Sequence, residues 1–110
     1  MLTLDKVVKE SYSTAMEKGW WEEPRTPIEL IALMHSELSE AVEEIRNNHA
    51  INEVYHEESG KPCGVPIELA DCIIRIADMC GACGIDLTDA VMQKLAYNKT
   101  RPHRHGGKKL

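Results

Sequence analysis

The chain lacks any long apolar segment. No run approaches the roughly 20 consecutive apolar residues that a helix needs to cross a bilayer, although 43% of the sequence is hydrophobic. The first residues, MLTLDKVVKESYS, also lack the basic start and apolar middle of a signal peptide. We therefore expect a cytoplasmic protein with no membrane partner.

An excess of basic charge is also missing. The 18 acidic residues outnumber the 13 basic ones, and the formal net charge is -5. A nucleic-acid-binding domain usually presents a basic stripe, so we expect no nucleic-acid partner. Basic residues do gather near the C-terminus, which leaves the rest of the chain more acidic than the total suggests. They are Arg101, Arg104, Lys108 and Lys109.

The cysteines lack the pattern of a zinc site. Cys80 and Cys83 have CxxC spacing, but Cys63 and Cys72 are too far apart in sequence to supply the second pair that zinc requires. A reducing compartment keeps such thiols free. We expect them to pack as small apolar side chains near a helix end.

Hydrophobic periodicity predicts an all-α fold, a bundle of about four helices in one domain. The expected helices run from about 3 to 18, from 27 to 47 or 48, from 66 to 83, and from 87 to 100. Thr26 and Asp86 are expected to cap two helices at their start, and Gly84 to end one. Residues 49–64 form a long connection with a short ordered piece at 51–55. Residues 1–101 are the expected domain, and 102–110 a basic tail without periodicity.

The second predicted helix carries two stripes. The broad apolar one reads as an ordinary buried face. Glu37, Glu40 and Glu44 form the other stripe, on which Leu30 and Leu33 also lie. A purely solvated face needs no leucines, so the acidic stripe is expected to be partly covered. The apolar face consists of Ile31, Met34, Leu38, Ala41, Val42 and Ile45.

The third predicted helix is apolar almost all round, which is typical of a buried helix. One narrow stripe nevertheless carries charged side chains. Burying unpaired carboxylates is costly, so a cation or hydrogen-bonding partners must offset the charge. Arg75 can neutralise one carboxylate but not the others. The charged stripe consists of Glu68, Asp71, Arg75 and Asp78.

Two acidic pairs with i, i+3 spacing, Glu37/Glu40 and Glu68/Asp71, can therefore provide an oxygen-only metal site on facing helices. Such ligands suit Mg²⁺, or Mn²⁺ in its place. A di-iron bundle would use Glu-x-x-His, and no histidine follows Glu37 or Glu68 by three. The simpler interpretation, that both stripes are solvent-facing edges of the bundle, remains open at this point.

At these residues the sequence resembles the MazG-like all-α nucleoside-triphosphate pyrophosphohydrolases. The resemblance covers roughly residues 26 to 110. It rests on HSELSEAVEE at 35–44, IELAD at 67–71, KLAYNKTRP at 94–102 and HGGK at 105–108. The sequence departs from the family in one place: the first motif often begins with two adjacent glutamates, and Ser36 occupies the first of these positions.

The resemblance implies a MazG-like helical domain that assembles into a homodimer or homotetramer. It also implies Mg²⁺-dependent hydrolysis of an NTP or dNTP to the monophosphate and pyrophosphate, for example to clear non-standard nucleotides from the pool. Glu37, Glu40, Glu68 and Asp71 would be the metal ligands and catalytic residues. A carboxylate-held metal can polarise a phosphoryl oxygen and activate water.

The fourth predicted helix is a candidate phosphate-binding element. Lys94, Asn98 and Arg101 share one face, beside an apolar stripe expected to pack on the bundle. Lysine and arginine both bind phosphate, whereas an exposed basic helix end needs no ligand. The apolar stripe consists of Leu87, Val91 and Leu95.

Other roles stay open at this stage. The aromatic side chains either stack a base or pack in the core and interfaces. Arg75 and Asp78 either support the metal site or form a structural ion pair. The alternatives to the proposed enzyme are a phosphoribosyl-ATP-type pyrophosphohydrolase and a non-catalytic module that binds a nucleotide or a partner protein. The aromatic residues concerned are Trp20, Trp21, Tyr55 and Tyr97.

Overall fold

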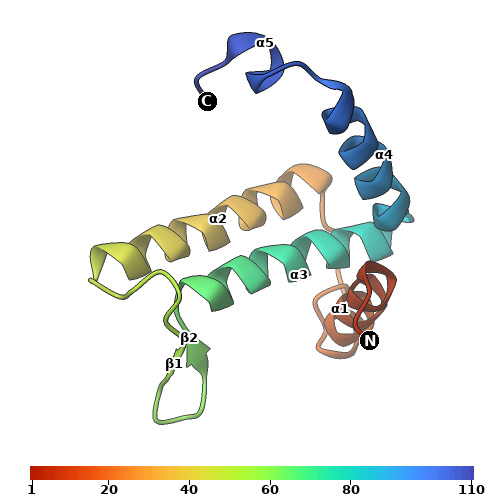
Figure 1. Cartoon of the computed structure of the whole chain (residues 1–110). Helices are drawn as coiled ribbons and strands as arrows, with labels where there is room; N and C mark the ends of the chain where they lie inside the picture. The colour runs from red at the N-terminus through yellow and green to blue at the C-terminus, as the bar shows by residue number, and fades with distance from the viewer.

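A computed structural model describes residues 1–110 and is predominantly helical (Figure 1). The all-α prediction is confirmed in outline, with a two-stranded hairpin and a short helix in the tail as the differences. None of the helices combines the length and apolar character needed to cross a membrane. The elements are α1 Leu4–Glu17, α2 Pro27–Arg46, β1 Tyr55–His56, β2 Pro62–Cys63, α3 Val65–Cys83, α4 Leu87–Thr100 and α5 Arg104–Gly107.

Helix ends follow the capping signals in the sequence. The Oγ1 atom of Thr26 accepts a hydrogen bond from the backbone N–H of Glu29 at 3.2 Å, and Asp86 caps α4 in the same way at 3.0 Å. Gly84 adopts φ +68° at the end of α3, a left-handed conformation that glycine reaches without strain. The predicted boundaries of α2, α3 and α4 are therefore confirmed to within two residues.

The connection between α2 and α3 is a hairpin. Tyr55 pairs with Cys63 and His56 with Pro62 in an antiparallel arrangement, so the expected ordered piece at 51–55 lies slightly too early in the chain. The Tyr55 hydroxyl donates to Glu44 at 2.8 Å, and the Tyr55 ring stacks on His49 with centroids 4.4 Å apart. These contacts tie the hairpin to the last turns of α2.

Helices α2 and α3 lie side by side and antiparallel, and α1 packs against α3 (Figure 1). Helix α4 leaves the end of α3 that is remote from the hairpin and meets the rest of the chain mainly through α1. It buries no residue. The expectation that Leu95 packs on the bundle is wrong for the single chain, because this residue is 57% exposed.

The face of α2 that packs against α3 is not the broad apolar one. Its buried residues are Leu30 and Glu37, which lie on the acidic stripe, and Ala41, a member of the apolar face that borders this stripe. Most of the expected buried face is exposed instead, and this prediction is corrected. The exposed residues of that face are Ile31, Leu38, Val42 and Ile45.

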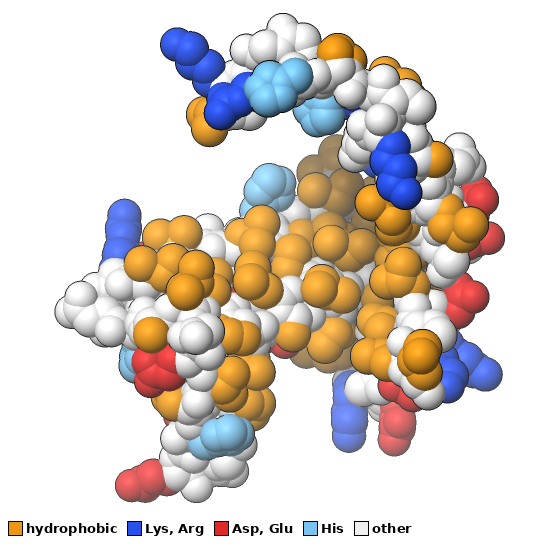
Figure 2. Space-filling view, in the orientation of Figure 1, with side chains coloured by type: hydrophobic (Ala, Val, Ile, Leu, Met, Phe, Trp, Pro, Cys, Tyr) orange, Lys and Arg blue, Asp and Glu red, His pale blue; other side chains and the backbone are white.

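The single chain has too much surface for its mass. Its accessible area is 8535 Å², whereas a compact monomer of 12.4 kDa is expected to expose about 6,100 Å². The radius of gyration is 16.5 Å, against about 13 Å for a compact domain. Hydrophobic side chains spread over α2 and towards α4 (Figure 2).

The thiols are free, as predicted. Three of them, Cys63, Cys72 and Cys80, are buried and pack as small apolar side chains. Cys83 is exposed, which corrects the expectation that all four are buried.

Gly81 allows α1 to approach α3 closely. A Cβ atom added at Gly81 would lie 2.5 Å from the Cβ of Tyr12, a separation that real Cβ atoms do not tolerate. The absence of a side chain at this position therefore sets the distance between the two helices.

We predict that Gly81→Ala destabilises the protein. Alanine inside a helix ordinarily stabilises it by roughly 0.5–1 kcal/mol relative to glycine, but the collision with Tyr12 reverses the sign. Urea unfolding of the wild type and of Gly81→Ala would measure the difference in the free energy of unfolding. The double variant Tyr12→Gly/Gly81→Ala should be at least as stable as Tyr12→Gly alone, because glycine at position 12 removes the Cβ atom that the new methyl group would meet. A stabilised Gly81→Ala single variant would contradict the close approach.

Candidate metal centre

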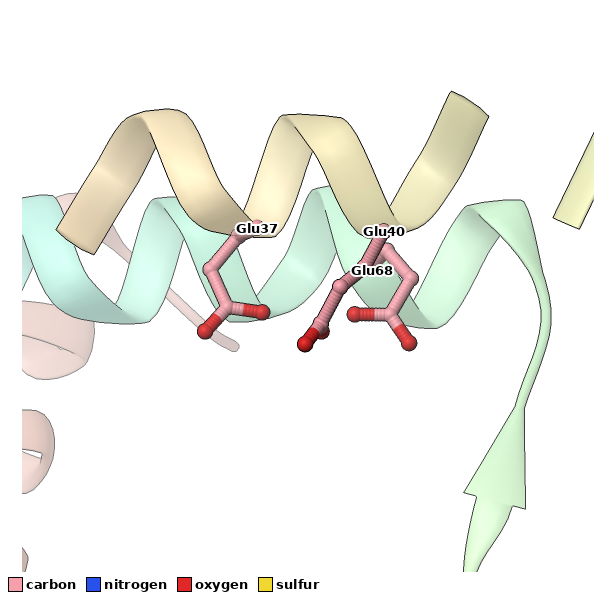
Figure 3. Close-up of side chains that lie close together, drawn as sticks. All are labelled: Glu37, Glu40 and Glu68. Atoms are coloured by element: carbon pink, nitrogen blue, oxygen red, sulfur yellow. The ribbon is translucent and has the colours of Figure 1, made fainter. Parts of the chain in front are cut away.

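Three carboxylates from two helices converge. One oxygen from each of Glu37, Glu40 and Glu68 lies within 4.8 Å of the other two. Glu37 and Glu40 are one turn apart on α2, and Glu68 extends from the first turn of α3 into the same space (Figure 3). The i, i+3 spacing on one helix and the antiparallel packing of the other bring these groups together.

Glu37 is the buried member of this cluster. It is only 6% exposed, and its Oε1 atom accepts a hydrogen bond from Nε of Arg75 at 2.6 Å. Its Oε2 atom is buried without a hydrogen-bond partner, and so is Oε2 of Glu68. Buried polar atoms are nearly always hydrogen-bonded to protein or water, so these two oxygens are the atoms of the cluster that can bind a cation or a water molecule.

The electrostatics of the cluster lead to the same inference. Burial raises the pKa of Glu68 to about 7, and a hydrogen bond with Glu40 and the negative charges of Glu40, Asp71 and Glu37 add to the effect. Arg75 compensates only one of these negative charges directly. A divalent cation would stabilise the ionised carboxylates and satisfy the free oxygens at once. Three carboxylates are hard oxygen donors, which suit Mg²⁺ or Mn²⁺ better than zinc.

Asp71 adjoins the cluster without being one of the three. It lies one turn after Glu68 on α3 and, with Glu37, lines a groove between α1 and α3. Burial and the negative charge of Glu37 raise the pKa of Asp71, against the opposing effect of Arg75. The structure thus brings three of the four predicted ligands together and places the fourth beside them.

The remaining charged residues of the two stripes have protein partners. Arg75 pairs with Glu37 rather than with Asp78, whose Oδ1 atom accepts a hydrogen bond from Nε1 of Trp21 at 2.9 Å. Glu44 accepts from the Tyr55 hydroxyl. The sequence did not predict this hydrogen bond between Tyr55 and Glu44, because helical spacing carries no information about a hairpin that folds back onto α2.

The predicted phosphate-binding face on α4 stands apart from the cluster. Glu68 is in the first turn of α3, whereas α4 begins beyond Cys83, the last residue of α3, which lies roughly 22 Å from Glu68 along the helix. Within α4, Nζ of Lys94 lies 5.0 Å from the centre of the Tyr97 ring, and the Arg101 guanidinium lies 5.6 Å from it. A single chain does not bring Lys94, Asn98 or Arg101 to the carboxylates.

Comparison with known proteins gives no match: no protein-family model, curated protein or solved structure is similar to this chain. The functional argument therefore depends on the residues and geometry described above.

We predict that Glu68→Gln stabilises the metal-free protein at neutral pH. Because the pKa of Glu68 is raised in the folded state from 4.5 to about 7, the fold binds this proton more tightly than the unfolded chain does. The stabilising contribution of this tighter proton binding is fully present below pH 4.5 and is lost as the pH rises through 7. The free energy of unfolding of the wild type should therefore fall relative to Glu68→Gln across this interval, as measured by urea unfolding in chelator.

Addition of Mg²⁺ should reverse the order of stability. A ligand that binds only the folded state at 100 times its dissociation constant stabilises it by about 2.7 kcal/mol, and the variant lacks one ligand. Equal stabilisation of both proteins by Mg²⁺ would argue against Glu68 as a ligand, and a pH-independent difference would argue against its raised pKa.

Proposed function

We propose that the chain is a Mg²⁺-dependent nucleotide pyrophosphohydrolase of MazG-like fold. The observation that carries the proposal is the buried Oε2 atom of Glu37, which has no partner although Glu40 and Glu68 lie beside it. An acidic cluster on a protein surface has no need of a ligand. A buried carboxylate oxygen is satisfied by a hydrogen-bond donor, a water molecule or a cation, and a hard divalent cation is the one of these that three convergent carboxylates suit best.

The residues in and beside the carboxylate cluster have different proposed roles. Glu37, Glu40 and Glu68 would hold the cation, and Asp71, which adjoins them on α3, would accept a proton from the attacking water. Arg75, which is 39% exposed in its side chain, can donate to a phosphate oxygen at the edge of the site. When bound, the metal supplies charge neutralisation at the phosphates and activation of water.

The sequence motifs favour a nucleotide as the substrate. Cleavage between the α- and β-phosphates adds water across that anhydride and releases a nucleoside monophosphate and pyrophosphate. Removal of non-standard NTPs or dNTPs from the pool is the role that such an activity suits. A phosphoribosyl-ATP-type substrate would use the same ligands, and product analysis distinguishes the two.

One observation favours a different function, that of a non-catalytic binding module. The Arg75–Glu37 ion pair neutralises part of the cluster without a metal. This pair does not explain the free oxygen of Glu68, so we place the enzyme first.

The exposed apolar surface supports self-association, as a homodimer or homotetramer. A surplus of about 2,400 Å² per chain, or about 4,800 Å² for a pair, falls within the range of roughly 2,000–5,000 Å² that obligate dimers bury. The apolar face of α2 is the natural contact. Assembly is also the condition under which Lys94, Asn98 and Arg101 of one copy can reach the carboxylates of another and bind phosphates there.

We predict that turnover requires Mg²⁺ or Mn²⁺ and that Glu40→Gln or Asp71→Asn lowers it at least ~100-fold, since even residues outside the ligand sphere of a metal cost 10–100-fold when replaced. Glu43→Gln is the matched control, because this exposed glutamate pairs with Arg46 on the outside of α2. Chromatographic identification of both products from a panel of canonical and modified nucleotides would measure turnover. Full activity in excess chelator would exclude the mechanism.

We predict that the protein sediments as a multiple of 12.4 kDa at micromolar concentration. Val42→Glu should shift it towards the monomer, because it places a charge on the exposed apolar face of α2. Asn52→Glu adds the same charge at an exposed loop position and should leave the assembly intact. A wild-type monomer, or equal effects of both substitutions, would contradict the contact.

A further inference from the structure

The connection that carries the hairpin is pinned to the end of α2 at two points (Figure 1). The Tyr55 hydroxyl donates to the carboxylate of Glu44 and lies 2.9 and 2.8 Å from its two oxygens. Oε1 of Glu53 accepts a hydrogen bond from the backbone N–H of Ala50 at 3.2 Å and lies 3.2 Å from Nδ1 of His49. The His49 and Tyr55 rings stack with their planes 11° apart. These contacts hold the connection in one arrangement against the last turns of α2.

The connection in turn fixes the residue that precedes α3. Tyr55 pairs with Cys63 across the hairpin, and Cys63 is buried. The next residue, Gly64, lies so close to the connection that an added Cβ atom would be 2.2 Å from the carbonyl oxygen of Glu53. Its φ is +120°, a conformation that residues with a side chain rarely adopt. Both the contact and the backbone conformation therefore require glycine at this position.

The first turn of α3 is hydrogen-bonded to this glycine. The carbonyl oxygen of Gly64 accepts the backbone N–H of Glu68 at 3.0 Å and that of Ile67 at 3.1 Å. The carboxylate of Glu68 meets those of Glu37 and Glu40 in the cluster (Figure 3). A displacement of the connection would therefore move Glu68 relative to the two glutamates of α2.

We infer that the hairpin connection positions Glu68 for metal binding, with Tyr55 and Glu53 as the positioning residues. The inference rests on the proposed function and concerns the assembly of its metal centre. Neither residue belongs to the carboxylate cluster, so each acts through Gly64 and the first turn of α3. Hydrogen bonds that hold metal ligands in place raise the affinity for the metal, and their loss costs roughly 10–100-fold.

A purely structural role makes a different prediction. If the connection served only the stability of the fold, its hydrogen bonds would raise the free energy of unfolding and leave the metal affinity of the folded protein unchanged. Mn²⁺ affinity, measured from the electron paramagnetic resonance signal of the free ion, therefore distinguishes the two roles. Urea unfolding in chelator measures stability separately.

Glu53→Ala and Glu53→Gln are the matched variants for this measurement. Both remove one negative charge from a side chain that is 40% exposed, but only glutamine keeps an oxygen that can accept from the N–H of Ala50. Glu53→Ala should weaken Mn²⁺ binding ~10-fold, and Glu53→Gln should keep most of the wild-type affinity. Equal affinities of the two variants would overturn the positioning role of Glu53.

Tyr55→Phe and Trp21→Phe form a second pair. Each removes one hydrogen bond from an aromatic side chain to a carboxylate, the first at the hairpin and the second at Asp78, nearer the other end of α3. Both should lower the free energy of unfolding, but only Tyr55→Phe should weaken Mn²⁺ binding, again ~10-fold. Wild-type or tighter binding by Tyr55→Phe, or an equal loss in Trp21→Phe, would overturn the positioning role of Tyr55.

Titration of the wild type with Mn²⁺ separates this inference from the proposed function. Binding by the wild type, with unchanged affinity in Glu53→Ala and Tyr55→Phe, would overturn only the positioning role. Absence of binding by the wild type would overturn the metal centre and the positioning role together. Circular dichroism checks that each variant is folded, and the Glu53 pair decides alone if Tyr55→Phe is not.

Discussion

The burial of Glu37 between α2 and α3 is the constraint on which the rest of the structure depends. A carboxylate that is 6% exposed would be costly without compensation, and Arg75 on the facing helix supplies a hydrogen-bonded charge to one of its oxygens. The other oxygen stays free beside Glu40 and Glu68. The same packing that positions α2 on α3 therefore brings three carboxylates together, and the proposed cation would bind between them.

This packing of α2 on α3 also determines which face of α2 is exposed to solvent. Because α2 turns its acidic stripe towards α3, its apolar stripe is left on the surface, with Leu38 and Val42 each more than two-fifths exposed. A large exposed apolar stripe is typical of an interaction surface. The proposed metal binding and the proposed self-association thus depend on one feature of α2, and a groove beside Glu37 continues from the cluster towards α1.

Much of this arrangement was predictable from sequence. Capping residues located α2, α3 and α4, and i, i+3 spacing identified Glu37, Glu40 and Glu68 as facing carboxylates. Periodicity could not decide which stripe of α2 packs within the chain, because an apolar face is equally suited to a core and to a second copy. The hairpin, the hydrogen bond from Tyr55 to Glu44 and the position of α4 depend on contacts between residues far apart in sequence, which local patterns do not encode. The role of Asp71 and the fold family stay predictions.

A crystal structure of the protein grown with Mn²⁺ tests the central claim most directly. The account predicts an anomalous difference peak within coordination distance, about 2.2 Å, of carboxylate oxygens from Glu37, Glu40 and Glu68, with the free Oε2 atom of Glu37 among the ligands. A centre without a peak at saturating Mn²⁺, with the Arg75–Glu37 pair intact and both buried oxygens bound to protein or water, would contradict it.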